Sequence, residues 1–278
     1  MSNKSIVYDP AASFEVSVSE TPYGNPQDGQ MLSVIYAPKG KGPFPALISV
    51  HGGAWNVGNR LSNKTIDEEL ARSGIVVAAI DCRVSPKHTF PAQVEDFSWA
   101  VQWLRAKTDS LSIDPGSIGA LGASSGGHTV MMSGLAPQGN ERISYAVLLW
   151  PVLDPYARYL YAREASRKDL VERSESYFQT TDKMMQGNPQ TLLDERRISA
   201  KPPVLIIQGT ADTNVPLSIP ERFVKTYESM GGEVSYKLFN GMPHGFNGWA
   251  PPLWSEATTD IKQFIAKQLN VSQPGFNS

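Results

Sequence analysis

Residues Ile118-Gly-Ala-Leu-Gly-Ala-Ser-Ser-Gly-Gly-His128 are the strongest indication of how this chain folds. The first four of them, 118–121, form a short apolar run of the kind expected for a strand covered on both faces. A helical segment, residues 125–135, follows at once. Between the two, GASSGG at 122–127 fits the pattern G-x-S-x-G with Ser124 at its centre. A chain that turns this sharply from strand to helix strains its central residue and requires small neighbours.

The turn at Ser124 also carries a chemical expectation. It presents the hydroxyl at the carboxyl end of the sheet, where the sites of open α/β sheets lie. The helix that follows points its N-terminus at negative charge that develops there. Ser124 is therefore the expected nucleophile. Ser125 is the competing hydroxyl, but it would sit one step into the helix.

Short apolar runs recur along the chain, and helical segments alternate with them. The further runs are residues 46–50, 75–80, 145–150 and 204–207. The further helical segments are residues 62–73, 92–106, 220–230 and 254–269. This alternation predicts an α/β fold with a mostly parallel central sheet of about eight strands flanked by helices.

Alternating segments near both ends complete the expected sheet. Residues 14–18 alternate apolar and polar side chains, and residues 31–36 are mostly apolar and β-prone. The ten residues between Glu20 and Met31 are rich in turn formers, so they are expected to join these two paired strands. Residues 233–239 alternate again and predict one more strand before the last helix.

One region departs from the alternation of strands and helices. Residues 151–202 carry no strand signal, which makes an unusually long connection for a compact domain. We expect one α/β domain over residues 1–278, with a helical insertion or lid at residues 154–200. The alternative is a surface elaboration without a part in the chemistry.

Composition excludes several classes of protein. The 278 residues include 25 Lys and Arg against 27 Asp and Glu, a net charge of -2. A nucleic-acid binder normally carries a basic excess, and nothing here favours an anionic membrane surface. Cys82 is the single cysteine, so no intramolecular disulfide can form. No apolar run is long enough for a signal peptide or a membrane span, so the expected location is the cytoplasm.

The segment HGGAW at residues 51–55 follows the strand expected at 46–50. Acyl transfer builds negative charge on a carbonyl oxygen, and preorganised N–H groups must meet that charge. Two consecutive glycines leave their N–H groups unobstructed. The expected oxyanion hole consists of the N–H groups of Gly52 and Gly53, with a third from Ser125.

The other residues near this loop have less specific expectations. His51 is expected to hold the loop in shape through a hydrogen bond while the glycines act on the substrate. Trp55, Val215 and Phe246 are the candidates for the wall of a substrate pocket, with core packing as the alternative for Trp55. Cys82 is expected to be a buried small residue, and His128 a packed, hydrogen-bonded one.

These motifs resemble one branch of a known superfamily. HGGAW, DCRVSP at 81–86 with FPA at 90–92 and Asp96, and GASSGGH at 122–128 are similar to hormone-sensitive-lipase-like α/β-hydrolases. That branch includes small carboxylesterases, relatives of feruloyl and acetyl-xylan esterases, and kynurenine formamidase. The resemblance spans roughly residues 30–269 and implies the α/β-hydrolase fold. Ala54 is a mild departure from the usual HGGG, and it leaves both expected donors in place.

The resemblance also indicates an acid and a base. The branch places its acid in the loop after the strand expected at 204–207, where Asp212 lies. Asp154 is the competitor, because the loop after the preceding strand can also reach the base. His244 lies in a Gly- and Pro-rich loop before the last helix, where an imidazole can be exposed. The order Ser124, Asp212, His244 is the chain order of α/β-hydrolases.

The resulting hypothesis is a serine carboxylester hydrolase that forms an acyl-enzyme with a small to medium ester. The mechanism needs no cofactor and no metal. The first alternative is an N-formyl amide hydrolase of kynurenine formamidase type, and the second is a non-catalytic ligand receptor on the same fold. A lipase is disfavoured because the insertion is charged. The expected partner is a small-molecule ester rather than nucleic acid or a membrane, and a homodimer is the candidate assembly.

Overall fold

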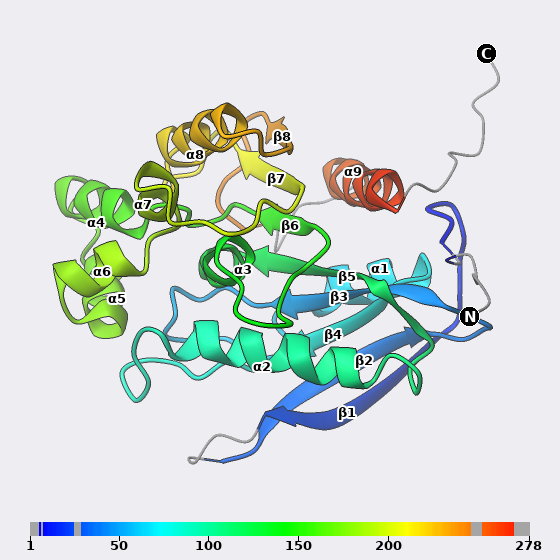
Figure 1. The fold of residues 1–278 in the computed structure, drawn as a ribbon. Helices are drawn as coiled ribbons and strands as arrows, with labels where there is room; N and C mark the ends of the chain where they lie inside the picture. The colour runs from blue at the N-terminus through cyan, green and yellow to red at the C-terminus, as the bar shows by residue number, and fades with distance from the viewer. Residues whose placement is uncertain (1–5, 7, 25–28, 246–251, 270–278) are drawn as a thin grey trace.

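A single eight-stranded sheet lies at the centre of the computed structural model, which describes residue 6 and residues 8–24, 29–245 and 252–269 (Figure 1). The strand order is β1-β2-β4-β3-β5-β6-β7-β8. The strands are β1 (Val16–Gly24), β2 (Met31–Pro38), β3 (Phe44–Val50), β4 (Val76–Ile80), β5 (Ile113–Ala123), β6 (Ala146–Leu149), β7 (Val204–Gly209) and β8 (Val234–Phe239). The strands from β3 to β8 pair in parallel, whereas β2 is antiparallel to both of its neighbours. The predicted α/β class and mostly parallel sheet are confirmed.

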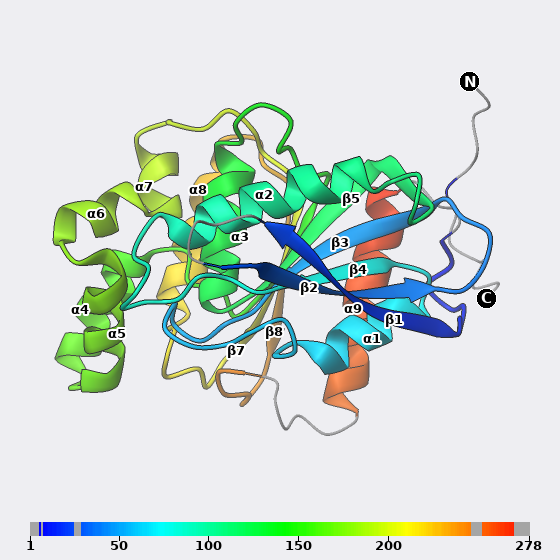
Figure 2. The ribbon, with the colours of Figure 1, turned by 90° about the horizontal axis from the view of Figure 1, so that it is seen from below.

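Helices cover both faces of the sheet because its central strands are apolar throughout. Every residue of β3, β4, β6 and β7 is buried. One face is covered by α2 (Ala92–Ala106), α3 (Ser125–Leu135) and α8 (Ser218–Ser229), which share a core cluster with Ile48 and Ile206. The other face is covered by α1 (Lys64–Arg72) and α9 (Leu253–Gln268), which pack with Leu47 and Leu205. Figure 2 shows α2 and α1 on opposite sides of the strands.

Four helices lie between β6 and β7 and gather beyond the carboxyl ends of the parallel strands (Figure 1). They are α4 (Pro155–Glu164), α5 (Lys168–Phe178), α6 (Thr181–Gln186) and α7 (Pro189–Asp194). Helices α4 and α7 begin in the same way. Asp154 and Asn188 accept hydrogen bonds from the first-turn amides, and a proline occupies the first helical position. We refer to α4–α7 as the insertion.

The N-terminal strand is longer than the sequence indicates. β1 continues through Thr21 and Pro22, which pair with Ser33 and Leu32 of β2. Both residues were expected in a turn. Proline is tolerated here because β1 is the edge strand, where a missing N–H removes no obligatory ladder bond. No helix in the described part of the chain is long and apolar enough to cross a membrane.

Candidate active site

The turn from β5 into α3 is as tight as its sequence indicates. Ser124 has φ 52° and ψ −115°, a backbone conformation that residues other than glycine rarely adopt. A Cβ on Gly122 would lie 2.5 Å from the Gly126 carbonyl oxygen, and one on Gly126 would lie 2.3 Å from that of Val50. Only glycine fits at these two positions. The turn therefore holds the Ser124 hydroxyl at the carboxyl end of the sheet.

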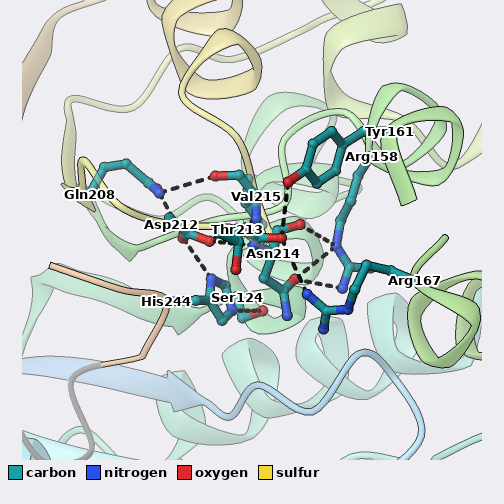
Figure 3. A network of polar contacts seen from close by, with 10 residues as sticks. All are labelled: Ser124, Arg158, Tyr161, Arg167, Gln208, Asp212, Thr213, Asn214, Val215 and His244. Atoms are coloured by element: carbon teal, nitrogen blue, oxygen red, sulfur yellow. Dashed lines mark hydrogen bonds and ion pairs between the residues drawn. The ribbon is translucent and has the colours of Figure 1, made fainter. Parts of the chain in front are cut away.

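Ser124, His244 and Asp212 form a continuous hydrogen-bonded chain (Figure 3). The Ser124 Oγ lies 3.0 Å from His244 Nε2. The Nδ1 of His244 lies 2.7 Å from Asp212 Oδ2. The three residues come from the turn after β5, the loop after β7 and the loop after β8. An imidazole held in this way accepts the hydroxyl proton at Nε2 while the carboxylate fixes its tautomer.

The Asp212 carboxylate is held by four hydrogen bonds. Its Oδ1 accepts from the backbone amides of Asn214 and Val215, both at 2.8 Å. Its Oδ2 accepts from His244 and from Gln208 Nε2, the latter at 2.8 Å. Burial opposes ionisation of Asp212, but the bonds from His244 and the two amides outweigh burial, and its pKa lies below the ordinary value. The carboxylate is thus kept charged beside the imidazole.

The alternatives raised for the nucleophile and the acid have other partners. Ser125 Oγ accepts from the backbone amide of Trp55 at 3.3 Å, away from His244. Asp154 accepts from Ala157 N and from Asn188 Nδ2, and it forms an ion pair with Arg222 at 3.1 Å. Asp154 therefore joins the insertion to α8 and makes no contact with the imidazole.

The loop after β3 lies directly against the nucleophile. A Cβ on Gly52 would lie 3.2 Å from the Ser124 Cβ. Gly53 has φ +121°, and a Cβ there would lie 2.0 Å from the carbonyl oxygen of Val57. Within the described residues, the N–H groups of Gly52, Gly53 and Ser125 have no hydrogen-bond acceptor. Three free donors thus lie close to the Ser124 hydroxyl.

The buried ring of His51 holds the loop after β3 in place. Its Nδ1 donates to the Gly52 carbonyl oxygen at 2.7 Å. Burial lowers the pKa of His51 despite that bond, so the ring is neutral at pH 7. A Cβ on Gly58 would lie 2.2 Å from Nδ1, so the loop closes tightly over the ring. This geometry fits the loop-holding role expected for His51.

A cavity of about 390 Å³ opens above the Ser124 hydroxyl. The loop after β3 and the Ser124 turn form one side, and α4 and α5 of the insertion form another. Its lining residues include Gly52, Gly53, Ser124, Trp150, Arg158, Asp169, Leu170, Arg173, Asn214 and His244. Such a volume falls at the lower end of the range of small-molecule sites, which is about 300–1,000 Å³.

Two of the three expected pocket residues lie in the core instead. Trp55 is fully buried, stacks on Tyr177 at 5.3 Å between ring centroids, and donates from Nε1 to His128 Nδ1. Its backbone has a φ of 62°, and its ring packs beneath the Arg158 guanidinium at 5.8 Å rather than lining the cavity itself. Val215 is also fully buried and contributes its backbone amide to Asp212. The third, Phe246, lies outside the described residues.

The expected packing roles of His128 and Cys82 agree with their surroundings. His128 Nε2 donates to the Gly187 carbonyl oxygen at 2.8 Å, which links α3 to the insertion. Burial lowers the pKa of His128 to about 4, so the ring is neutral at pH 7. Cys82 is buried, and burial raises its pKa. The described part of the chain contains no group of three or more His, Cys, Asp or Glu arranged to hold a metal ion.

Sequence reasoning missed the side chains that brace the acid loop from the insertion (Figure 3). Arg158 Nη2 donates to Asn214 Oδ1 at 2.7 Å, and its Nε donates to the same oxygen at 3.1 Å. Tyr161 Oη and Arg167 Nη1 both donate to the Thr213 carbonyl oxygen. No local motif marks these residues. They appear in the sequence as ordinary charged and aromatic residues of a helical segment.

Known proteins resemble this chain over most of its length. The BD-FAE family profile matches residues 32–226. Esterase LipC of Mycobacterium tuberculosis is 29% identical over 226 residues, covering 74% of this chain and 54% of LipC. The probable carboxylic ester hydrolase LipM of the same organism is 27% identical, covering 84% of this chain and 58% of LipM. The chain therefore spans about half the length of these curated relatives.

Solved esterase structures are similar in fold. Esterase 2 of Thermogutta terrifontis with propionate bound superposes with a TM-score of 0.74 at 25% identity, covering 95% of this chain and 97% of the esterase. An esterase of Pyrobaculum calidifontis superposes with a TM-score of 0.77 at 25% identity, covering 93% and 86% of the two chains. These likenesses confirm the predicted α/β-hydrolase fold.

Proposed function

The chain belongs to the BD-FAE family, within the hormone-sensitive-lipase-like branch of α/β-hydrolases, and on that premise we propose that it hydrolyses small to medium carboxylic esters. Ser124 is the nucleophile, His244 the general base and Asp212 the residue that orients the base. One observation carries the proposal, namely the unbroken hydrogen-bond chain from Ser124 Oγ through His244 to Asp212. The names of LipC, LipM and the solved neighbours, all esterases or ester hydrolases, support the choice of an ester.

The first half of the reaction forms the acyl-enzyme. His244 Nε2 takes the hydroxyl proton as Ser124 Oγ attacks the carbonyl carbon of the ester. The oxyanion that forms accepts hydrogen bonds from the free N–H groups of Gly52, Gly53 and Ser125. Loss of one such donor typically raises the barrier by about 3 kcal/mol. The imidazolium then returns its proton to the leaving alcohol as the ester C–O bond breaks.

The second half releases the acid. His244 removes a proton from water as that water attacks the acyl carbon, and the same N–H groups bind the second oxyanion. The proton then passes to Ser124 Oγ as the acyl bond breaks. Throughout the cycle, the ionised Asp212 stabilises the imidazolium and keeps its Nδ1–H in place.

Initial rates on p-nitrophenyl esters of increasing acyl length test this proposal. Ser124→Ala should lower kcat by about 10³-fold or more. Ser133→Ala is the matched control, because this buried hydroxyl lies on the same helix and has no hydrogen-bond partner among the described residues. It should leave the rates unchanged.

An inactive wild-type protein and an active Ser124→Ala variant would overturn different parts of the proposal. If the wild-type protein hydrolyses none of these esters, ester hydrolysis is not its activity. If Ser124→Ala retains the wild-type rate, the reaction proceeds but the nucleophile has been misassigned. The chain-length profile of an active wild-type enzyme then measures how much of the cavity the acyl group fills.

A further inference from the structure

Arg158 is a buried cation without a direct anionic partner. Its side chain on α4 is 1% exposed and lines the cavity above Ser124. Two of its nitrogens bond the oxygens of Asn214, but Nη1 has no hydrogen-bond partner, and no carboxylate of the described residues pairs with the guanidinium. Arginine is almost never buried in this way unless an anion compensates its charge. Asp212 on the far side of Asn214, Asp169, and the Trp55 ring 5.8 Å from the guanidinium offset the charge only in part.

Arg173 adds a second positive charge to the same wall. Asp169 and Leu170 lie one helical turn before Arg173 on α5. All three residues line the cavity. Asp169 is already bound by both ends of its carboxylate to Arg167, with two bonds of 3.0 Å. The Arg173 guanidinium has no hydrogen bond or ion pair within the described part of the chain. The cavity wall thus carries two arginines and one carboxylate, and that carboxylate is already paired with Arg167.

We propose that Arg173 and Arg158 form an anion subsite, and that the enzyme selects esters carrying a carboxylate beyond the scissile bond. The inference rests on the proposed ester hydrolysis and names its class of substrate. The carboxylate would bind the free Arg173 guanidinium and supply the counter-charge that Arg158 lacks. The ester carbonyl would meanwhile lie at Ser124, since both features belong to one cavity.

Low exposure to water and the planar shape of the guanidinium both favour a bound carboxylate at this wall. An ion pair at a fully solvated surface contributes little, whereas a charge near a buried guanidinium is screened less by water. A planar guanidinium also offers paired N–H groups that match a carboxylate. The rival explanation is that Arg158 only braces Asn214 and that the cavity binds no anion. In that case, removing the charge of Arg173 changes the rates on neutral and anionic esters equally, so the two explanations differ in a measurable ratio.

Matched pairs of esters measure that ratio. Monoethyl glutarate against ethyl glutaramate places a carboxylate or an isosteric carboxamide on the acyl half. The pair of para-acetoxybenzoate and para-acetoxybenzamide places the same groups on the alcohol half. The quantity measured is kcat/KM for the anionic ester divided by that for its neutral partner. A preference within one pair identifies the half of the ester that carries the anion.

Three variants complete the experiment. Arg173→Gln should lower the anionic-to-neutral ratio by about tenfold or more, a change worth about 1.4 kcal/mol. Arg173→Lys keeps the charge and should retain most of the wild-type ratio. Arg163→Gln is the matched control. It also removes one positive charge from the insertion, but Arg163 lies on α4 and does not line the catalytic cavity. This variant should leave the ratio unchanged.

The outcomes separate this inference from the proposed function. If the neutral esters are hydrolysed but both ratios are below one in the wild-type enzyme, the subsite is wrong and the esterase stands. An unchanged ratio in Arg173→Gln likewise overturns the subsite and leaves the esterase intact. If no ester of either kind, including the p-nitrophenyl series, is hydrolysed, the esterase proposal falls and the substrate class falls with it.

Discussion

The Ser124 turn and the insertion meet at one cavity but are built in different ways. Around the turn, the reacting groups are held by backbone: glycines at 122 and 126 fit against carbonyl oxygens, and Ser124 has a positive φ. In the insertion, the cavity is reached by long side chains from helices, above all Arg158 and Arg173. In the proposed reaction, the groups that break bonds and the groups that recognise the substrate are thus separated within one site. The first depend on a rigid turn, and the second depend on which side chains the helices carry.

Asp67 in the scaffold and Arg158 in the insertion respond to burial in opposite ways. Asp67 of α1 is fully buried, and neither of its oxygens has a hydrogen-bond partner in the described part of the chain. Burial raises the pKa of Asp67 to about 8 although the nearby Ser49 hydroxyl opposes the rise, so the scaffold carries this group in its neutral form at pH 7. Burial lowers the pKa of Arg158 to about 10, and the guanidinium remains charged at pH 7. A charge that is kept despite burial is available to a ligand.

Asp212→Asn should have the largest effect and acts only on the reacting groups. The amide side chain cannot accept and hold the His244 Nδ1–H as the carboxylate does, so kcat should fall by about 10⁴-fold. Steady-state kinetics on a p-nitrophenyl ester measures the loss. Asp194→Asn in the insertion removes an acid that pairs with Arg222 and should leave kcat within twofold. A loss of less than tenfold for Asp212→Asn would show that another group orients His244.

Gly126→Ala tests whether backbone contact holds the turn. The new Cβ would lie 2.3 Å from the Val50 carbonyl oxygen and 2.6 Å from that of His51, so the loop after β3 must move. The free energy of unfolding should fall by about 3 kcal/mol, as for other overpacked sites, and ester hydrolysis should fall as well. Gly134→Ala on the same helix is the control, since its Cβ would meet Ile143 at an ordinary 3.4 Å. Urea denaturation of both variants measures the difference, and equal stabilities would contradict the steric argument.

Asp67→Asn tests the neutral buried acid of the scaffold. The pKa of Asp67 is about 8 in the folded protein and about 4 in the unfolded chain. Between these values the unfolded chain binds fewer protons, so the free energy of unfolding falls as the pH rises and levels off above pH 8. The variant loses this dependence, and its stability relative to wild type should rise by about 2 kcal/mol between pH 5 and pH 7.

Urea denaturation at the two pH values measures this change in relative stability. Glu69→Gln is the control, because Glu69 is a partly exposed residue on α1 that pairs with Lys262 at 2.5 Å. Its stability should follow the wild-type pH dependence. Parallel curves for Asp67→Asn and wild type would mean that Asp67 is ionised in the folded protein.

Asn188→Ala should have the smallest effect and acts only on the insertion. Asn188 caps α7 and donates to Asp154 at 2.8 Å, so its loss should lower the free energy of unfolding by about 1 kcal/mol. It does not line the catalytic cavity, and kcat/KM on a neutral ester should stay within threefold of wild type. Thermal unfolding and ester kinetics check both parts. A tenfold drop in kcat/KM would show that the insertion and the reacting groups are not separable.

Much of the fold could be predicted because its signals are local. The apolar runs 46–50 and 204–207 each lie within a buried strand, and the helical segments 92–106 and 125–135 have the bounds of α2 and α3. The end of β1 was missed because Thr21 and Pro22 carry turn propensity that pairing with β2 overrides. Trp55 was expected at the cavity because proximity to the glycines in sequence does not reveal which way its ring points.

The amino-acid pattern alone was enough to predict the α/β class, the strained turn at Ser124 and the glycine loop at 52–53. These follow from short-range sterics, which leave a pattern within a few residues. The packed structure showed that Asp212, the acid already preferred over Asp154, meets His244, and only that structure placed Arg158 and Arg173 at the same cavity. Those contacts join helices and loops far apart in the chain, and long side chains on a charged helix look alike in sequence whether they face solvent or substrate. The physical reason is that packing of distant elements, which has no local signature, sets their direction.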